Sequence, residues 1–162
     1  FTLVTSGMSS RPMNVPPGRE GCEYSELVLC LPSDWHVLEG DYEKEQYWWP
    51  FRLLKFLARL PHEEGCWAWA GTTVPNGDPP EPYDASVGYC CALIAAPILF
   101  GDDFLTLTLD GRAVHFHSVL PLYREEMDAK LAGGLDALLD LWDEKAPEIC
   151  ELVNPERRNA GL

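Results

Sequence analysis

The sequence lacks the signatures of the common enzyme classes. It contains no G-x-S-x-G elbow, no glycine-rich phosphate loop and no cysteine set in a protease motif. Two pairs of neighbouring carboxylates, Glu63-Glu64 and Glu125-Glu126, are not arranged as an acid/base pair, because adjacent side chains do not converge. We therefore expect a protein that is not an enzyme and uses no cofactor.

Basic residues are also scarce. The chain has 12 lysines and arginines against 26 acidic residues, which gives a formal net charge of −14. A charge of this size repels phosphate backbones and anionic membranes, so we expect neither nucleic acid nor a membrane among its partners. The excess of acidic residues has two interpretations. It either keeps the protein soluble or forms a surface that attracts a basic protein partner.

The sequence has no apolar run long enough to cross a membrane and no C-x-x-C pair. With 162 residues it can bury a core of its own, so we expect one domain over residues 1–162 with a C-terminal tail over residues 146–162. Most of its six cysteines lie in apolar runs, and we expect them to be reduced in a cytoplasmic protein. One disulfide in an exported protein is the alternative.

The chain also lacks an initiator methionine, and it opens on a β-rich stretch, residues 1–5. We therefore expect a longer parent protein from which an N-terminal segment is missing. Residues 6–13 are mostly small and turn-forming, which predicts a turn at the edge of a sheet with Met8 and Met13 packed over it. A second interpretation makes the serines of this turn an anion-binding nest beside Arg11.

What the sequence does contain is an alternation of short apolar runs and longer helical patterns. The short runs predict strands over residues 1–5, 26–31, 66–74, 87–96, 104–109 and 112–119. Helical spacing predicts helices over 49–60, from Pro121 to the glycine pair 133–134, and over 135–144. The run at 26–31 is apolar on both faces, which predicts a sheet covered from both sides.

The first helix is expected to begin at Trp49, to tolerate Pro50 in its first turn and to stop at Pro61. The residues that share its apolar stripe are Trp49, Leu53, Phe56, Leu57 and Leu60, and those facing water are Arg52, Lys55 and Arg59.

The clearest local signal is Asp110-Gly111, a two-residue turn between two alternating runs. It predicts a hairpin in which Leu109 faces Arg112, and the same register places Leu107 opposite Val114. We expect that apolar face to belong to the core.

The other face of the hairpin pairs Thr106 with His115 and Phe104 with His117, on what we expect to be its more polar side. Two imidazoles on one strand face supply only two of the three or four ligands that a metal site needs. The conceivable third ligands are Asp103, Glu125 and Glu126. Cross-strand packing explains both histidines without a metal, so we expect none, and a small metal-dependent or hydrolytic enzyme remains the alternative.

The helix predicted over 135–144 carries the densest charge of the chain. Its expected buried residues are Leu135, Leu138, Leu139 and Trp142, and its expected exposed residues are Asp136, Asp140, Asp143 and Glu144. Like charges four residues apart cost a few tenths of a kcal/mol per pair. These four acids either sit harmlessly in solvent or form a partner-binding face for a cationic protein. We expect residues 154–162, which include Arg157 and Arg158, to fray.

Four stretches of the chain resemble the suppressor of fused family, and they occur in the order that this family shows. They are Thr5-Ser-Gly-Met-Ser-Ser-Arg-Pro-Met13, Glu26-Leu-Val-Leu-Cys-Leu-Pro-Ser-Asp-Trp35, Trp49-Pro-Phe-Arg-Leu-Leu-Lys-Phe-Leu-Ala-Arg-Leu-Pro61 and Leu120-Pro-Leu-Tyr-Arg-Glu-Glu126. The resemblance implies an α+β domain with a central mixed, largely antiparallel sheet and packed helices, normally preceded by another segment.

The resemblance also implies a function. Animal members of the family are cytosolic proteins that hold a transcription factor by wrapping a peptide of it between domains. Bacterial members of similar length are proposed to be immunity proteins, which neutralise toxins of polymorphic toxin systems. We therefore expect a non-catalytic protein-binding domain that occludes a partner such as a basic toxin domain. The alternatives are an enzyme that uses His115 and His117, and a scaffolding module.

Overall fold

The sheet is built around strand β6 (Arg112–Leu122), which crosses the whole molecule. In the computed structural model, which describes residues 1–146 and 152–162, β6 lies between two buried strands. It pairs in parallel with β2 (Tyr24–Cys30) and antiparallel with β4 (Cys91–Ala95). The strands predicted at 26–31 and 87–96 are therefore confirmed, with different bounds.

Three short strands complete the sheet. β1 (Thr2–Val4) lies at the edge next to β2, and β3 (Thr73–Pro75) lies at the opposite edge next to β4. β5 (Thr106–Leu109) pairs with the first half of β6. The order is β1-β2-β6-β4-β3, and among these named strands every pairing except β2 with β6 is antiparallel. The fold class is therefore α+β with a mixed, largely antiparallel sheet, as the resemblance implied.

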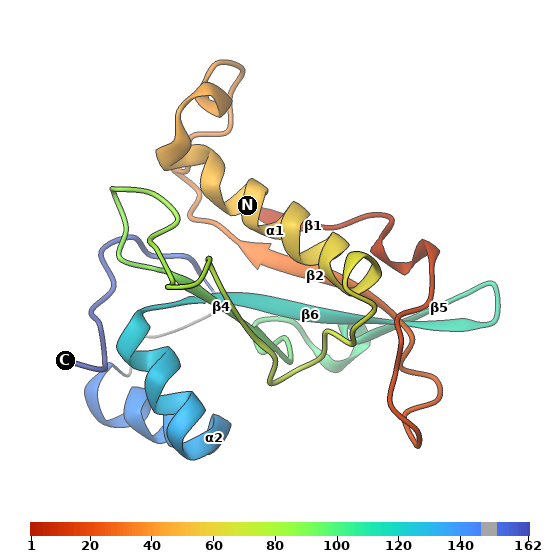
Figure 1. The fold of residues 1–162 in the computed structure, drawn as a ribbon. Coiled ribbons are helices and arrows are strands. Elements are labelled where there is room, and N and C mark those ends of the chain that lie inside the picture. Colours follow the sequence, from red (N-terminus) through yellow and green to blue (C-terminus); the bar gives the residue numbers. More distant parts are fainter. Residues whose placement is uncertain (147–151) are drawn as a thin grey trace.

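Two long helices cover the sheet from opposite sides, α1 (Glu45–Glu63) on one face and α2 (Arg124–Lys145) on the other (Figure 1). Strand β4 shows why both faces must be apolar. Ala92 and Ile94 belong to the core cluster that contains α1, whereas Cys91 and Leu93 belong to the cluster that contains α2. The prediction of a sheet covered from both sides is confirmed. Short 3-10 turns occur at Met8–Ser10, Asp41–Glu43 and Asp102–Phe104.

Helix α1 is longer than the sequence predicted. It begins at Glu45, one turn before Trp49, and Glu45 forms an ion pair with Arg52 at 2.5 Å. Pro61 does not stop it, because a proline in the last turn removes only one backbone donor, and the helix runs on to Glu63. The predicted stripe is confirmed at Trp49, Leu53 and Leu57, which are buried. It is wrong at Phe56, which is 40% exposed because it lies at the edge of the stripe.

Helix α2 starts at Arg124, so the prediction that Pro121 begins it is wrong. Pro121 lies inside β6, where pairing with β2 has already ended at Ser118, so its missing N–H leaves no partner in β2 unpaired. The predicted break at the glycine pair is confirmed, since Gly134 has a φ of +83°. The prediction that Leu139 is buried is wrong, because its side chain is 42% exposed.

The strand predicted over 66–74 is also wrong, apart from its last residues in β3. Gly71 has a φ of +93°, a conformation that interrupts any strand, and a turn closes there because Thr72 Oγ1 accepts a hydrogen bond from the Trp69 amide at 3.2 Å. The two tryptophans of this segment, Trp67 and Trp69, stack on each other with ring centroids 5.2 Å apart.

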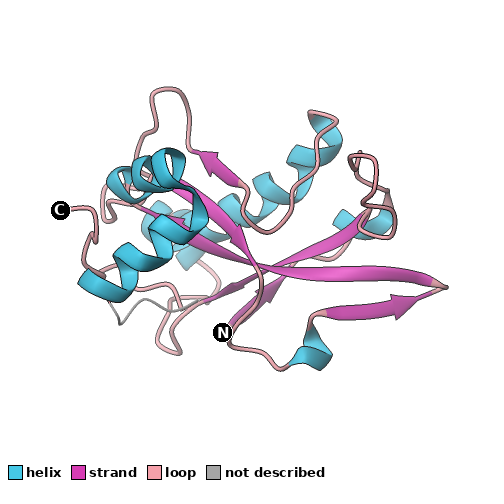
Figure 2. Ribbon diagram, turned by 90° about the horizontal axis from the view of Figure 1, so that it is seen from below, coloured by secondary structure: helices cyan, strands magenta, loops and turns pink. Residues whose placement is uncertain are grey.

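The β5–β6 hairpin has the predicted register, with Leu109 opposite Arg112 and Leu107 opposite Val114. The prediction that this face belongs to the core holds for Val114 but not for β5, where Leu107 and Leu109 are each 51% exposed. The end of the hairpin extends past the part of the sheet that the two helices cover (Figures 1 and 2).

The C-terminal segment is packed, contrary to the expectation that it frays. Leu152 forms a parallel bridge with Cys30, and the Val153 amide donates to the Cys30 carbonyl at 2.9 Å. Arg157 and Ala160 are buried beside α2. Residues 147–151 of the predicted tail lie outside the described residues.

Candidate protein-binding surfaces

The predicted acidic face lies on the outer side of α2. The four acids of this face, Asp136, Asp140, Asp143 and Glu144, are all exposed. No salt bridge to any of them is found within residues 1–146 and 152–162. Both lysines of the helix are engaged elsewhere, Lys130 with Thr73 Oγ1 at 2.8 Å and Lys145 with the Leu162 carbonyl at 3.4 Å. The face therefore presents four exposed carboxylates that form no salt bridge within the described residues.

The two histidines of the hairpin are part of an aromatic cluster, which corrects the prediction that they lie on a polar face. The ring of Trp69 meets His115 at 5.0 Å and His117 at 4.3 Å, both in edge contacts. The predicted pairing of Phe104 with His117 is wrong, because Phe104 lies in the 3-10 turn before β5 and packs on Phe116 at 5.0 Å.

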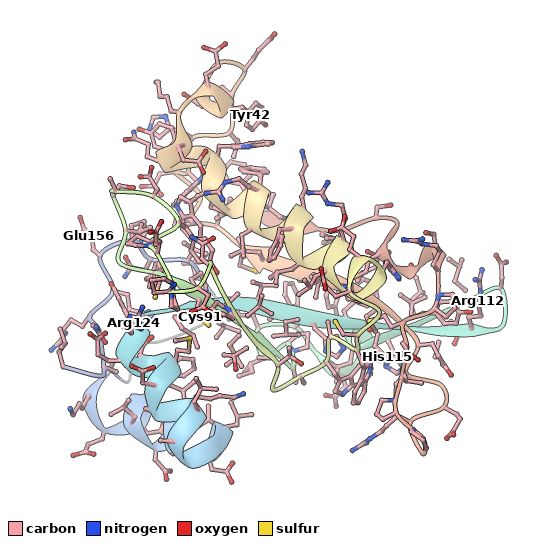
Figure 3. The ribbon with its side chains drawn as sticks, viewed as in Figure 1. Tyr42, Cys91, Arg112, His115, Arg124 and Glu156 are labelled. Carbon is pink, nitrogen blue, oxygen red and sulfur yellow. The ribbon has the colours of Figure 1, made fainter. Side chains whose placement is uncertain are left out.

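This cluster does not form the metal site that we considered. Both ring nitrogens of His115 are engaged, Nδ1 with Thr106 Oγ1 at 3.1 Å and Nε2 with the Gly21 carbonyl at 2.9 Å. Glu125 and Glu126 lie near the opposite end of β6, as the positions of His115 and Arg124 in Figure 3 show. Within the described ranges no group of three potential ligands comes together.

His117 makes stability depend on pH. Burial, helped by the nearby His115, lowers the pKa of His117 from 6.5 to about 4, and its side chain is only 4% exposed. The unfolded chain therefore binds more protons than the folded chain between pH 6.5 and pH 4, so stability is lost as the pH falls through this window. From this group we expect a loss of about 2 kcal/mol between pH 7.5 and pH 5.

Urea unfolding of the protein and of His117→Leu at the two pH values measures this loss. The variant should lose much less stability on acidification, because it has no imidazole to protonate on unfolding. His115→Gln is the matched control and should keep most of the dependence, because burial, the larger cause of the low pKa of His117, is retained. An equal loss in the parent and in His117→Leu would show that another group is responsible.

The opening turn does hold an anion, but the anion is a side chain of the same protein. Glu26 Oε1 accepts hydrogen bonds from the amides of Gly7 and Ser9, both at 3.0 Å, and from Ser9 Oγ at 2.6 Å. Glu26 Oε2 accepts one from Thr5 Oγ1 at 2.5 Å. Burial raises the pKa of Glu26, but these hydrogen bonds outweigh it and leave the pKa below 4.5. The nest is therefore filled, and the predicted packed turn at a sheet edge is confirmed.

A second buried carboxylate, Glu126, was missed by sequence reasoning, which considered it only as one of two neighbouring carboxylates and as a conceivable metal ligand. Glu126 is fully buried and forms a two-pronged ion pair with Arg157, at 2.5 Å and 2.8 Å. It also accepts hydrogen bonds from the amides of Tyr123 at 3.0 Å and Ala160 at 3.2 Å. Arg157 in turn donates to the Pro121 carbonyl at 3.1 Å. These contacts fasten the C-terminal segment to the start of α2.

The buried thiols are poor nucleophiles. Burial raises the pKa of Cys91 to about 12 and raises that of Cys90. Cys22, Cys66, Cys90 and Cys91 are not in disulfides, and Cys150 lies outside the described residues.

A groove of about 790 Å³ runs between the edge strand β1 with its turn and helix α1. Its apolar lining includes Leu3, Met8, Phe51, Leu54 and Ala58, and its charged lining consists of Arg11, Lys55, Arg59 and Glu63. Sequence reasoning missed this groove. The helical pattern places Lys55 and Arg59 on one exposed face, but it gives no sign that β1 lies beside them.

Comparisons with known proteins agree on one family. The sequence profile of the suppressor of fused protein matches residues 1–158. No curated protein matches the chain in sequence. No helix of the described residues is long and apolar enough to cross a membrane.

Three solved structures are similar to the chain. A suppressor of fused homologue from Neisseria gonorrhoeae FA 1090 has a TM-score of 0.61 at 18% identity, over 98% of this chain and 69% of the other. The Sufu–Fu complex has a TM-score of 0.62 at 16% identity, over 90% of this chain and 62% of the other. Drosophila Suppressor of Fused has a TM-score of 0.61 at 17% identity, over 88% of this chain and 33% of the other. This chain therefore corresponds to only part of each solved protein.

Proposed function

The chain belongs to the suppressor of fused family, and on that premise we propose that it is a non-catalytic protein-binding domain that acts as an immunity protein. It would neutralise a toxin of a polymorphic toxin system by covering the toxin's active site with a preformed surface. One of the similar structures is a complex of Sufu with Fu, which supports protein binding as the general activity.

The observation that carries the proposal is the acidic face of α2. Toxins that attack nucleic acid are commonly basic, and a preformed acidic face both attracts such a protein and competes with nucleic acid for its active site. The four acids point outward without ion pairs among the described residues, so their charges remain available to a partner. The formal charge of −14 extends this attraction over the whole molecule.

The strongly perturbed ionisable groups support a binding role over a catalytic one. Catalytic groups with shifted pKa values are expected in accessible clefts. Here the pKa of Cys91, His117 and Tyr89 is displaced chiefly by burial, and all three side chains belong to the packed interior. The proposal places the protein in the cytoplasm, where such a toxin would find nucleic acid.

Co-expression tests this function. The toxin would be the C-terminal domain of a large secreted protein encoded beside this gene. Cells that produce this toxin domain together with the chain should grow, and cells that produce the toxin alone should die. Continued killing despite soluble expression of the chain would contradict the proposal for that pair. A complex that forms without restoring growth would favour the scaffolding interpretation.

Charge reversal on α2 tests the surface itself. We expect the triple variant Asp136→Lys, Asp140→Lys and Asp143→Lys to bind the toxin domain with an association rate about tenfold lower or more at low salt, because electrostatic steering is lost. Stopped-flow or surface plasmon resonance measures the rate. The matched control makes the same change in net charge elsewhere, at Glu43, Asp102 and Asp103, which are exposed and not part of α2. Equal rates for the two triple variants would show that the α2 face is not the contact.

A further inference from the structure

The outer edge of strand β5 is open. The Phe116 amide donates to the Leu105 carbonyl at 3.0 Å, which fixes the residues that bond across the hairpin. Bonding residues alternate along an antiparallel pair, so the peptide groups of Thr106 and Thr108 point away from β6. No strand of the described chain pairs with β5 on this outer side, and all four residues of β5 are exposed. The edge can therefore accept one more strand.

One face of the hairpin is apolar and only partly covered. Val114 lies on the same face of β6 as Leu120 and Leu122, which belong to the core cluster that contains α2. Leu107 and Leu109 share this face through their pairing with β6. Both leucines are 51% exposed, because α2 packs near the other end of β6 (Figure 1). A strand added to β5 would place alternate side chains beside them and bury part of their surface.

Carboxylates flank β5 at both ends. Asp102 and Asp103 lie in the 3-10 turn before it, Asp110 lies in the turn after it, and all three are exposed. No salt bridge to any of them is found within the described part of the chain. The hairpin has one arginine and no lysine, and the guanidinium of this Arg112 lies 5.1 Å from the centre of the Tyr24 ring, on the side of β2. A segment that complements the open edge therefore carries positive charge at both ends.

A second copy of this chain fits the edge poorly. Pairing β5 with β5 would bring the same carboxylates of two copies together, and each copy has a formal charge of −14. Like charges on neighbouring strands destabilise their pairing, whereas opposite charges stabilise it. The charge around β5 therefore favours a basic partner over self-association.

We propose that β5 binds an extended basic segment of a partner protein, which adds to the sheet as a strand along the open edge. Backbone hydrogen bonds to Thr106 and Thr108 supply the pairing. Alternate side chains of the segment lie beside Leu107 and Leu109, and its lysines or arginines meet the carboxylates at the two ends of β5. This edge is separate from the acidic face of α2, so the proposal does not rest on the immunity function.

Fluorescence polarisation at low salt with two labelled octapeptides tests the charge preference. Both peptides alternate valine with threonine over their four central residues. One has two lysines at each end, and the other has two glutamates at each end. The protein is used as its gene encodes it, so that every part of it that could cover the edge is present. The lysine peptide should bind and the glutamate peptide should not. Equal binding of the two peptides, or of neither, would overturn the proposal.

Neutralising the acids beside β5 tests their part in this preference. The lysine peptide should bind about tenfold more weakly to the triple variant Asp102→Asn, Asp103→Asn and Asp110→Asn. The hairpin should persist in this variant, because Asn-Gly also favours a two-residue turn. The matched control removes three charges from α2, by Asp136→Asn, Asp140→Asn and Asp143→Asn, and should bind the peptide as the parent does. An equal loss in both triple variants would show attraction to the whole molecule and overturn the proposal.

A further variant tests strand addition apart from charge. In Thr108→Pro the lost N–H is one that points away from β6, so the edge strand should tolerate it while the peptide ladder is broken. We expect binding of the lysine peptide to fall about tenfold, with unchanged urea unfolding. Thr108→Val keeps the N–H and is the matched control, which should bind as the parent does. A lysine peptide that is N-methylated at its four central residues should not bind the parent protein. Full binding of this peptide, or of the lysine peptide to Thr108→Pro, would contradict strand addition.

Two other occupants of the edge would also overturn the proposal. Light scattering that shows a dimer, which Thr108→Pro returns to a monomer, would assign the edge to a second copy of the chain. Strong protection of the Thr106 and Thr108 amides from hydrogen exchange without peptide would assign it to another part of the same protein. In the proposed state these two amides are protected only when the lysine peptide is present.

Discussion

Replacing Arg157 by alanine should lower the free energy of unfolding by about 3–5 kcal/mol, because it leaves the Glu126 carboxylate buried without its charged partner. Arg157 is 8% exposed and Glu126 is fully buried, so water reaches neither group freely. The variant also loses the hydrogen bond to the Pro121 carbonyl and the contact of the guanidinium with the Tyr123 ring at 5.0 Å. Urea unfolding followed by tryptophan fluorescence measures the change.

Two controls separate the causes of this loss. Arg158→Ala removes the same charge from an exposed neighbour and should cost less than about 1 kcal/mol. Arg157→Lys keeps the charge but not the two-pronged geometry, so its loss should lie between the two. A loss below about 1 kcal/mol in Arg157→Ala would show that the C-terminal segment does not depend on this ion pair.

Replacing Glu26 by alanine should cost about 2–4 kcal/mol, because several donors in the opening turn lose their acceptor at once. Glu26 is 6% exposed, and the amides of Gly7 and Ser9 both point at it. The turn that carries Met8 into the core depends on these bonds, so we also expect faster amide hydrogen exchange in β1.

Glu26→Gln is the matched control for this prediction. Its amide oxygen can replace Oε1, which receives three of the four hydrogen bonds, so the loss should be smaller than in the alanine variant. The pKa of Glu26 is depressed, so its contribution is present above pH 4.5 and is lost as the pH falls through its folded pKa. Equal stability of parent and Glu26→Ala at pH 7 would contradict this role.

The elements that the sequence predicted well are those governed by local chemistry. The Asp110-Gly111 turn fixed the hairpin register, and a helix needs a break at Gly134 because few other residues adopt its φ. Predictions from local patterns were wrong where contacts between distant segments determine the secondary structure. Pro121 looks like a helix start, but the strand pairing of β6 with β4 continues through it.

The buried carboxylates and the groove also depend on tertiary contacts that local sequence does not reveal. Glu26 and Glu126 lie in sequence among other acids, and nothing local separates them from the exposed ones. Each is buried because donors from a distant segment surround it, Ser9 in one case and Arg157 in the other. The exposed acids of α2 were predictable from helical spacing alone. The groove was not, because it requires β1 to lie beside α1, and these segments are about 40 residues apart in the chain.

The molecule has two surfaces of opposite charge. The acidic face of α2 lies on one side of the sheet, and the groove with its basic rim lies by α1 on the other (Figure 1).

A titration of toxin activity with the purified chain tests the central claim most directly. If the chain is a non-catalytic protein that occludes its partner, nuclease activity of the toxin domain should fall linearly and end at one chain per toxin. Inactivation of many toxin molecules by each chain would reveal catalysis. No loss of activity at a large molar excess of folded chain would show that it is not the immunity partner.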